Sequence, residues 1–122
     1  MATFPFFLQF QYVLTANGTG TVQYPVPPNE KLELSELRFV STGAFSVTDI
    51  RDSTGKHFTN ASSAVPILST LLQNAQNGYI SAKDFDVPLE VGGNVTFYMD
   101  LKDTSGAGNT VNLLLTGVKT TT

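Results

Sequence analysis

Apolar and polar residues alternate along residues 85–101, with one interruption at Gly92-Gly93-Asn94. The apolar positions are Phe85, Val87, Leu89, Val91, Val95, Phe97, Met99 and Leu101. A side-chain period of two, broken by residues that tolerate positive φ, is typical of a β-hairpin with one buried face. The segment therefore predicts a hairpin, and variants of the pattern recur along most of the chain.

The same alternation predicts further strands over residues 8–14, 21–26, 31–40, 45–51 and 110–118. Asn17-Gly18 predicts a turn after the first of them. Between Leu34 and Leu37 the apolar positions change parity, which predicts a β-bulge near Ser35-Glu36. A turn at residues 52–55 is expected to let residues 56–59 pair back as a short hairpin arm. The tail, residues 119–122, is expected to fray.

Residues 60–77 differ from the rest because their apolar positions have helical spacing. These positions are Ile67, Leu68, Leu71 and Leu72. Pro66 suits the first position of a helix, and Asn77-Gly78 suits its end. We predict one short helix in the 60–77 connection, with an extended loop as the alternative.

Seven or eight short strands with regular turn signals predict an all-β fold, a β-sandwich or barrel. The long middle connection favours a jelly-roll or other Greek-key β-sandwich of about eight strands. An immunoglobulin-like topology is the main rival. We expect a single β-sandwich domain over residues 1–122, with an N-terminal apolar arm at about residues 1–8.

Composition narrows the classes of function. The chain has 122 residues, a formal net charge of −3 and no cysteine, and its few basic residues are scattered. Disulfides and thiolate chemistry are therefore excluded, and we expect no nucleic-acid partner. No apolar run approaches the ~20 residues of a membrane span. The N-terminus lacks the basic region of a signal peptide, so we expect a soluble protein made in a cytoplasm.

Residues with catalytic or metal-binding chemistry are sparse. His57 is the single histidine, whereas a small enzyme of the cupin type needs a cluster of them. Residues 100–106 contain oxygen ligands at short spacing, but Lys102 interrupts them. We interpret residues 102–109 as a polar tip, and a Ca²⁺ site at 100–109 stays open. The sequence predicts no enzyme, no catalytic residue, no cofactor and no metal site.

The apolar N-terminus suggests contacts between molecules. So much apolar surface at a chain start indicates an arm docked on its own sandwich or on a neighbour. The 60–77 connection is expected to contribute to the same contacts. The candidate assembly interface consists of Phe4, Phe6, Phe7, Ile67, Leu68 and Leu71.

The order of these patterns resembles a known family. Residues 32–40 lead through Ser41-Thr42-Gly43 into residues 45–52, and the helical connection, the 85–101 segment and a terminal strand follow. This arrangement resembles the small single-jelly-roll proteins of virus particles, particularly bacteriophage capsid, decoration or spike subunits. The resemblance implies eight strands in two four-stranded sheets, homo-oligomers that meet other virion proteins, and a place in the virion.

A carbohydrate-binding or lectin-like module on the same fold is the alternative, and its partner would be a glycan. The tyrosines that could stack on a sugar are Tyr12, Tyr24, Tyr79 and Tyr98. Tyrosines at strand positions are more often half-buried structural residues. The sequence therefore favours the assembly subunit.

Overall fold

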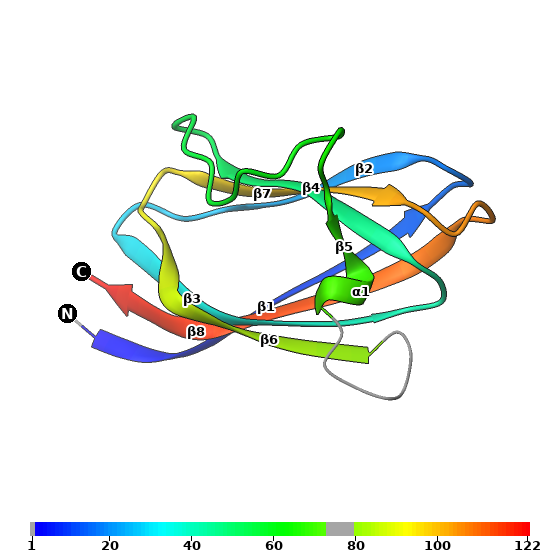
Figure 1. Ribbon diagram of the computed structural model, residues 1–122. Coiled ribbons are helices and arrows are strands. Elements are labelled where there is room, and N and C mark those ends of the chain that lie inside the picture. The colour runs from blue at the N-terminus through cyan, green and yellow to red at the C-terminus, as the bar shows by residue number, and fades with distance from the viewer. Residues whose placement is uncertain (1, 73–79) are drawn as a thin grey trace.

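The computed structural model describes residues 2–72 and 80–122, with side chains over 2–70 and 88–122. Two four-stranded sheets face each other, with strand orders β1-β8-β3-β6 and β2-β7-β4-β5 (Figure 1). The strands are β1 (Ala2–Leu14), β2 (Thr19–Pro25), β3 (Glu30–Ser41), β4 (Phe45–Asp52), β5 (Ile67–Leu68), β6 (Ile80–Val91), β7 (Thr96–Asp103) and β8 (Asn109–Thr121). The prediction of an all-β sandwich is confirmed.

The strand pairing identifies the type of sandwich. β1 pairs with β8, β2 with β7, β3 with β6 and β4 with β5, all antiparallel. The chain is thus one long hairpin, with its tip between β4 and β5, that is wrapped into two layers. Ladders between β3 and β8 and between β4 and β7 complete the sheets. This is a jelly roll. In the immunoglobulin arrangement the first two strands are neighbours in one sheet, whereas here β1 and β2 lie in different sheets.

The predicted hairpin over residues 85–101 is wrong in its pairing. β6 pairs with β3, whereas β7 pairs with β2 and β4 in the other sheet. The turn signal is present, since Asn94 has a φ of 63°, but the turn carries the chain across the core. Alternation reports that each strand has one buried face. It does not report whether the two strands share a sheet, because a strand in either layer buries every second side chain against the core.

The two chain ends form longer strands than predicted. β1 begins at Ala2 and pairs with β8 without interruption from Ala2↔Thr121 to Leu14↔Asn109. Residues 2–8, which were predicted as an arm, thus continue the edge strand of their own sheet. The expected fraying of residues 119–122 is wrong for residues 119–121, because β8 lies between β1 and β3 and is hydrogen-bonded on both sides.

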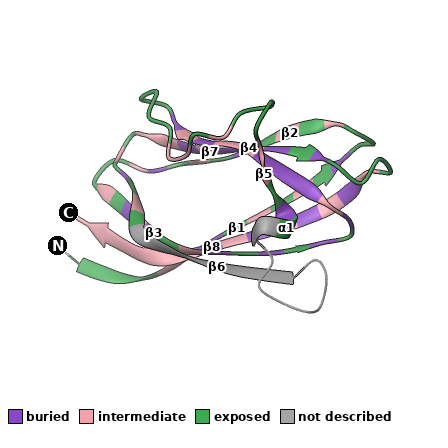
Figure 2. Ribbon diagram, viewed as in Figure 1, coloured by how far each residue is buried: buried purple, intermediate pink, exposed green. Residues whose placement is uncertain are grey.

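The predicted β-bulge in β3 is confirmed. The register with β8 shifts between Leu34 and Glu36, which pair with Gly117 and Thr116, so Ser35 is the additional residue relative to β8. The register with β6 shifts at the same position of β3. The shift keeps Leu34 and Leu37 both turned into the core, at 0% and 2% exposed. Without it, Leu37 and Phe39 would face solvent. Buried segments of both sheets accordingly line the space between the layers (Figure 2).

The connection from β4 to β6 contains a short helical turn. Helix α1 (Ser69–Leu72) begins three residues after Pro66 and follows the two-residue strand β5. The expected helix end at Asn77-Gly78 lies outside the described residues. The expected arm at residues 56–59 is reduced to an isolated bridge between Arg51 and His57. Among the residues described, no helix has the length and apolar character to cross a membrane.

Candidate interaction surface

The sequence-predicted interface residues of β1 lie on both faces of the strand. Phe4 and Phe6 point between the sheets, because they pair with Lys119 and Gly117 on the inward side of β8. The Lys119 ammonium lies 5.5 Å from the Phe4 ring centre and 5.0 Å from that of Phe6. Phe7 points outward and is 66% exposed. The three phenylalanines therefore do not form one patch.

The predicted residues of the 60–77 connection lie in the other sheet. Ile67 packs against the core, and Leu68 is 43% exposed. Both form the short edge strand β5 beside β4. Leu71 belongs to α1, and its side chain lies outside the described part of the structure. The structure therefore separates Phe7 and Leu68 onto different sheets.

More apolar residues lie on the outward side of the β1-β8-β3-β6 sheet, among polar ones such as Gln9, Arg38 and Asn112, and we call this side the outer face. Its apolar members are Pro5, Phe7, Val13, Val40, Leu114 and Val118. Val13 is 68% exposed and Val40 is 51% exposed. Sequence reasoning did not select these residues, apart from Phe7. The sequence signal for the outer face was an apolar residue that lies between two inward-facing apolar neighbours and therefore faces outward. Leu114 is an example, because it lies between Leu113 and Leu115.

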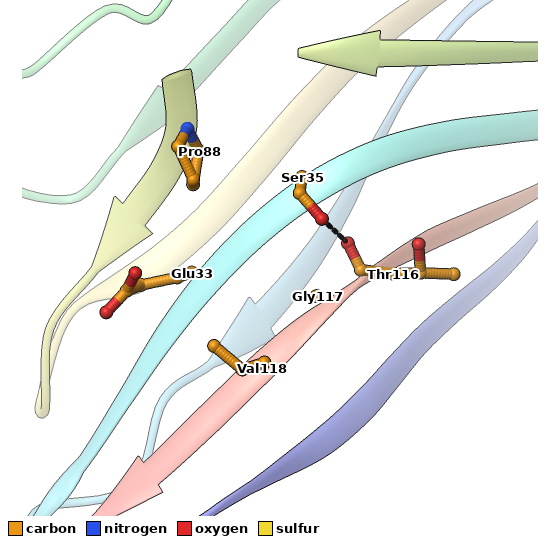
Figure 3. Close-up of a pocket in the computed structure, with 6 residues that line it drawn as sticks. All are labelled: Glu33, Ser35, Pro88, Thr116, Gly117 and Val118. Atoms are coloured by element: carbon orange, nitrogen blue, oxygen red, sulfur yellow. Dashed lines mark hydrogen bonds between the residues drawn. The ribbon is translucent and has the colours of Figure 1, made fainter. Parts of the chain in front are cut away.

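The outer face contains a hollow of about 330 Å³ (Figure 3). Its lining residues are Glu33, Ser35, Pro88, Thr116, Gly117 and Val118. The hollow lies where the bulge disturbs the ladder between β3 and β8, and the Ser35 hydroxyl donates a hydrogen bond of 3.3 Å to the Thr116 carbonyl oxygen. Gly117 allows β3 and β8 to approach closely below the hollow, because it has no side chain. A Cβ there would lie 1.9 Å from the Glu33 carbonyl oxygen.

The outward side of the other sheet has a polar network. The Arg51 guanidinium donates hydrogen bonds of 2.9 and 3.2 Å to the two carboxylate oxygens of Asp100, and Thr21 donates a third of 2.6 Å. Burial raises the pKa of Asp100, but these hydrogen bonds outweigh it and hold the pKa below its ordinary value. The hydrogen bond between Arg51 and Asp100 also raises the pKa of Arg51. The network ties β2, β7 and β4 together.

His57 lies at the margin of this network. Its Nδ1 lies 2.8 Å from Asp49 Oδ2, and its side chain is 58% exposed. The contact joins the loop after β4 to the outward side of that strand. It gives His57 a structural partner in the turn region. Over the described residues, no three histidine, aspartate or glutamate side chains gather closely enough to hold a metal ion.

Asp103 lies within residues 100–109, the segment with oxygen ligands at short spacing. Its carboxylate is fully buried and accepts hydrogen bonds from the backbone N–H groups of Asn17, Ser105, Gly106 and Gly108. The Ser105 hydroxyl and the Asn109 side-chain amide donate two more. The Ser105 hydroxyl, followed by the backbone donors, holds the pKa of Asp103 far below its usual range. Donor groups thus surround both oxygens, and the carboxylate organises the β7–β8 loop.

The tyrosines considered for sugar stacking have structural contacts. A Cβ added to Gly20 would lie 2.2 Å from the Tyr12 ring, so that ring lies on the Gly20 backbone. The Tyr24 ring centre lies 6.0 Å from that of Phe6. The Tyr98 ring has the Arg51 guanidinium 4.5 Å from its centre. Tyr79 lies outside the described residues.

Comparison with known proteins identifies no relative of this chain. No protein-family model matches the chain, and no curated protein matches it at the level that indicates a relative.

Proposed function

We propose that this chain is a structural subunit of a virus particle, such as a capsid, minor capsid, decoration or spike protein. The observation that carries the proposal is the pairing of β1 with β8, β2 with β7, β3 with β6 and β4 with β5. Eight strands wrapped in this way are the architecture of viral capsid domains, and also of lectin and cupin domains. The role is architectural and requires no catalytic residue or cofactor.

Among these uses of the fold, the surface of the β1-β8-β3-β6 sheet favours assembly with other protein subunits. β1 is an edge strand of 13 residues with no charged side chain. Edge strands of monomeric proteins are commonly protected by charge or kept short, because free backbone groups attract further strands. The outer face adds exposed Phe7, Val13 and Val40. Large exposed apolar patches mark contacts with other proteins.

The cupin use of the fold fits this chain poorly, because it requires clustered metal ligands. The lectin-like use depends on an open aromatic platform. Tyr98 is half-buried, and Arg51 already occupies a face of its ring. We therefore propose as partners further copies of this chain and other virion proteins, with the virion as its location.

The native mass of the purified protein tests the proposal. Sedimentation velocity from nanomolar to high micromolar concentration is expected to show a discrete oligomer, and negative-stain imaging is expected to show rings, spikes or shells. Symmetric closure is expected because most homo-oligomers have closed point-group symmetry. A monomer at every concentration would contradict the proposal. A glycan array with binding that is lost in Tyr98→Ala would support the lectin-like alternative instead.

A further inference from the structure

A projecting ring and a hollow lie next to each other on the outer face. Phe7 is 66% exposed and pairs directly with Thr116 on the neighbouring strand. Thr116 in turn lines the hollow beside the β3 bulge. Both side chains point outward from the same sheet, so Phe7 lies beside the hollow without being part of its lining.

We propose that a second copy of this chain covers the outer face, with Phe7 of each copy inserted into the hollow of the other. The two copies are related by a two-fold axis through the face. This inference rests on the proposed function, which requires self-assembly, and adds the surface, the occupant and the contact residues.

The dimensions of the hollow suit a phenyl ring. A buried apolar cavity of about 150 Å³ holds a benzene molecule, whereas this hollow has about 330 Å³. Pro88 and Val118 supply apolar walls, and the backbone of Gly117 lies between Thr116 and Val118 in the lining (Figure 3). Glu33, Ser35 and Thr116 supply the polar groups of the lining. Interfaces between proteins commonly combine apolar and polar groups in this way.

Charge and symmetry favour a second copy over an unrelated partner. A two-fold contact is self-complementary, so one surface must carry both the inserted group and its receptor. The outer face carries both, in Phe7 and the hollow. β1 has no charged residue, and Glu33 in the lining of the hollow forms an ion pair of 3.6 Å with Lys31, which lowers the repulsion between two copies of a chain with net charge −3.

The outer face is large enough for a stable dimer. Four strands of 12 or 13 residues form the sheet. Spacings of about 4.8 Å between strands and about 3.4 Å along them give a face of about 19 by 44 Å, or about 800 Å². A standard interface buries about 800 Å² on each partner. The described part of the chain lays no segment across this face (Figure 1).

Two variants of the full chain test the contact from opposite sides. Phe7→Ala removes the inserted ring, and Ser35→Tyr fills the hollow. Both positions are exposed, so the core is unchanged. Val13→Ala is the matched control, because Val13 is also an exposed apolar residue of β1 on the outer face, at 68% exposed, but does not line the hollow. Circular dichroism and thermal melting establish that each variant is folded.

Sedimentation equilibrium gives the dissociation constant of the dimer. We expect Phe7→Ala and Ser35→Tyr each to weaken dimerisation by about 100-fold, the effect of losing a central aromatic anchor, and Val13→Ala to change it by less than about 5-fold. An equimolar mixture of the two variants restores one of the two contacts, so its affinity is expected to lie between those of the wild type and the variants.

The outcomes separate this inference from the proposed function. An oligomer that persists unchanged in folded Phe7→Ala and Ser35→Tyr leaves the assembly role standing and overturns the inference. Equal weakening by Val13→Ala also overturns it, because the contact would then not depend on the ring and the hollow. A wild-type monomer at all concentrations overturns both.

Discussion

Asp103 lies fully buried at the end of β7, where its carboxylate accepts hydrogen bonds from the β7–β8 loop and from the turn after β1. A loop of this kind would otherwise leave several N–H groups without partners, at a cost in stability for each one. One side chain therefore holds together the two crossings at this end of the sandwich. Asp52 has a similar role after β4, where it accepts hydrogen bonds from Thr54 and Lys56.

Stability is predicted to fall in acid because of these carboxylates. The pKa of Asp103, and to a lesser extent those of Asp52 and Asp100, is lowered in the folded chain. Their contribution is complete above the unfolded pKa of about 4 and is lost progressively as the pH falls below it. Thermal melts from pH 7 to pH 2 should show Tm decreasing below about pH 4.

The Asp103→Asn variant isolates the contribution of this residue. It is expected to lower Tm at pH 7, because an amide cannot accept all the hydrogen bonds, and to show a smaller further decrease in acid than the wild type. Glu90→Gln is the control. Glu90 makes an exposed ion pair of 3.6 Å with Lys31, so the change should cost less than about 1 kcal/mol. An acid profile for Asp103→Asn that parallels the wild type would contradict the prediction.

Gly117 is required by close approach of the backbone. A Cβ there would lie 1.9 Å from the Glu33 carbonyl oxygen and 2.8 Å from Leu34 Cα. Gly117→Ala is therefore expected to lower the free energy of unfolding by about 3 kcal/mol, through displacement of β3. Gly92→Ala is the matched control, since a Cβ there meets nothing within 4 Å. Urea unfolding measures the free energy of unfolding of both variants. An equal loss in the two would contradict the prediction, because the close approach at Gly117 would then add no cost.

The bulge in β3 determines which residues of that strand face the core. Ser35 is the additional residue, and its removal would give a continuous register with β8, with Leu34 and Leu37 still facing inward. Deletion of Ser35 is therefore expected to keep the fold at a cost of about 1 kcal/mol. The hollow loses one of its lining residues at the same time.

Deletion of Arg38 is the matched test of this interpretation. It moves Phe39, which is 2% exposed, to the outward side of the strand. The expected cost is about 3–5 kcal/mol, comparable with truncation of a buried Phe. Thermal melts of both deletions measure the difference. An equal loss of stability in the two deletions would contradict this interpretation. The fold would then require the bulge itself, and not only the inward orientation that the bulge gives to the apolar residues after it.

The wrapped hairpin makes the two ends of the chain mutually dependent. β1 and β8 pair along their whole lengths, yet β1 is an edge strand whereas β8 has neighbours on both sides. Contacts between such distant residues are also expected to make folding slow, because loop closure precedes their formation. The last residues of β8 carry further contacts, including an ion pair of 3.2 Å between Lys119 and Glu30.

Truncation at the two ends is predicted to have unequal effects. Deletion of residues 119–122 removes pairing with both β1 and β3 and the Lys119 contacts, so we expect a loss of about 2 kcal/mol, or about 8 °C in Tm. Deletion of residues 2–5 removes pairing with β8 alone and is expected to cost about half as much. Thermal melts compare the two, and a larger loss from the N-terminal deletion would contradict this assignment of central and edge strands.

The sequence was sufficient for properties that depend on neighbouring residues. The period of two identified the strands, and the change of parity between Leu34 and Leu37 located the bulge, because each reflects which side of one strand avoids water. The jelly-roll class followed from the number of strands and the long middle connection. The same pattern could not give strand partners. It therefore predicted a hairpin over residues 85–101 and a frayed C-terminus, whereas hydrogen bonds to distant strands govern both.

The candidate surface depended on tertiary structure for the same reason. Phe7 was identified from the sequence, but Phe4 and Phe6 face inward, and Ile67 and Leu68 lie in the opposite sheet. Val40 and Leu114 join Phe7 because β1, β8 and β3 lie side by side. The hollow forms where a bulge in β3 meets a glycine in β8, two features more than 80 residues apart, as the separation of 81 residues between hydrogen-bonded Ser35 and Thr116 shows. Local patterns encode the faces of each strand, and only the packing of distant strands creates the shape between them.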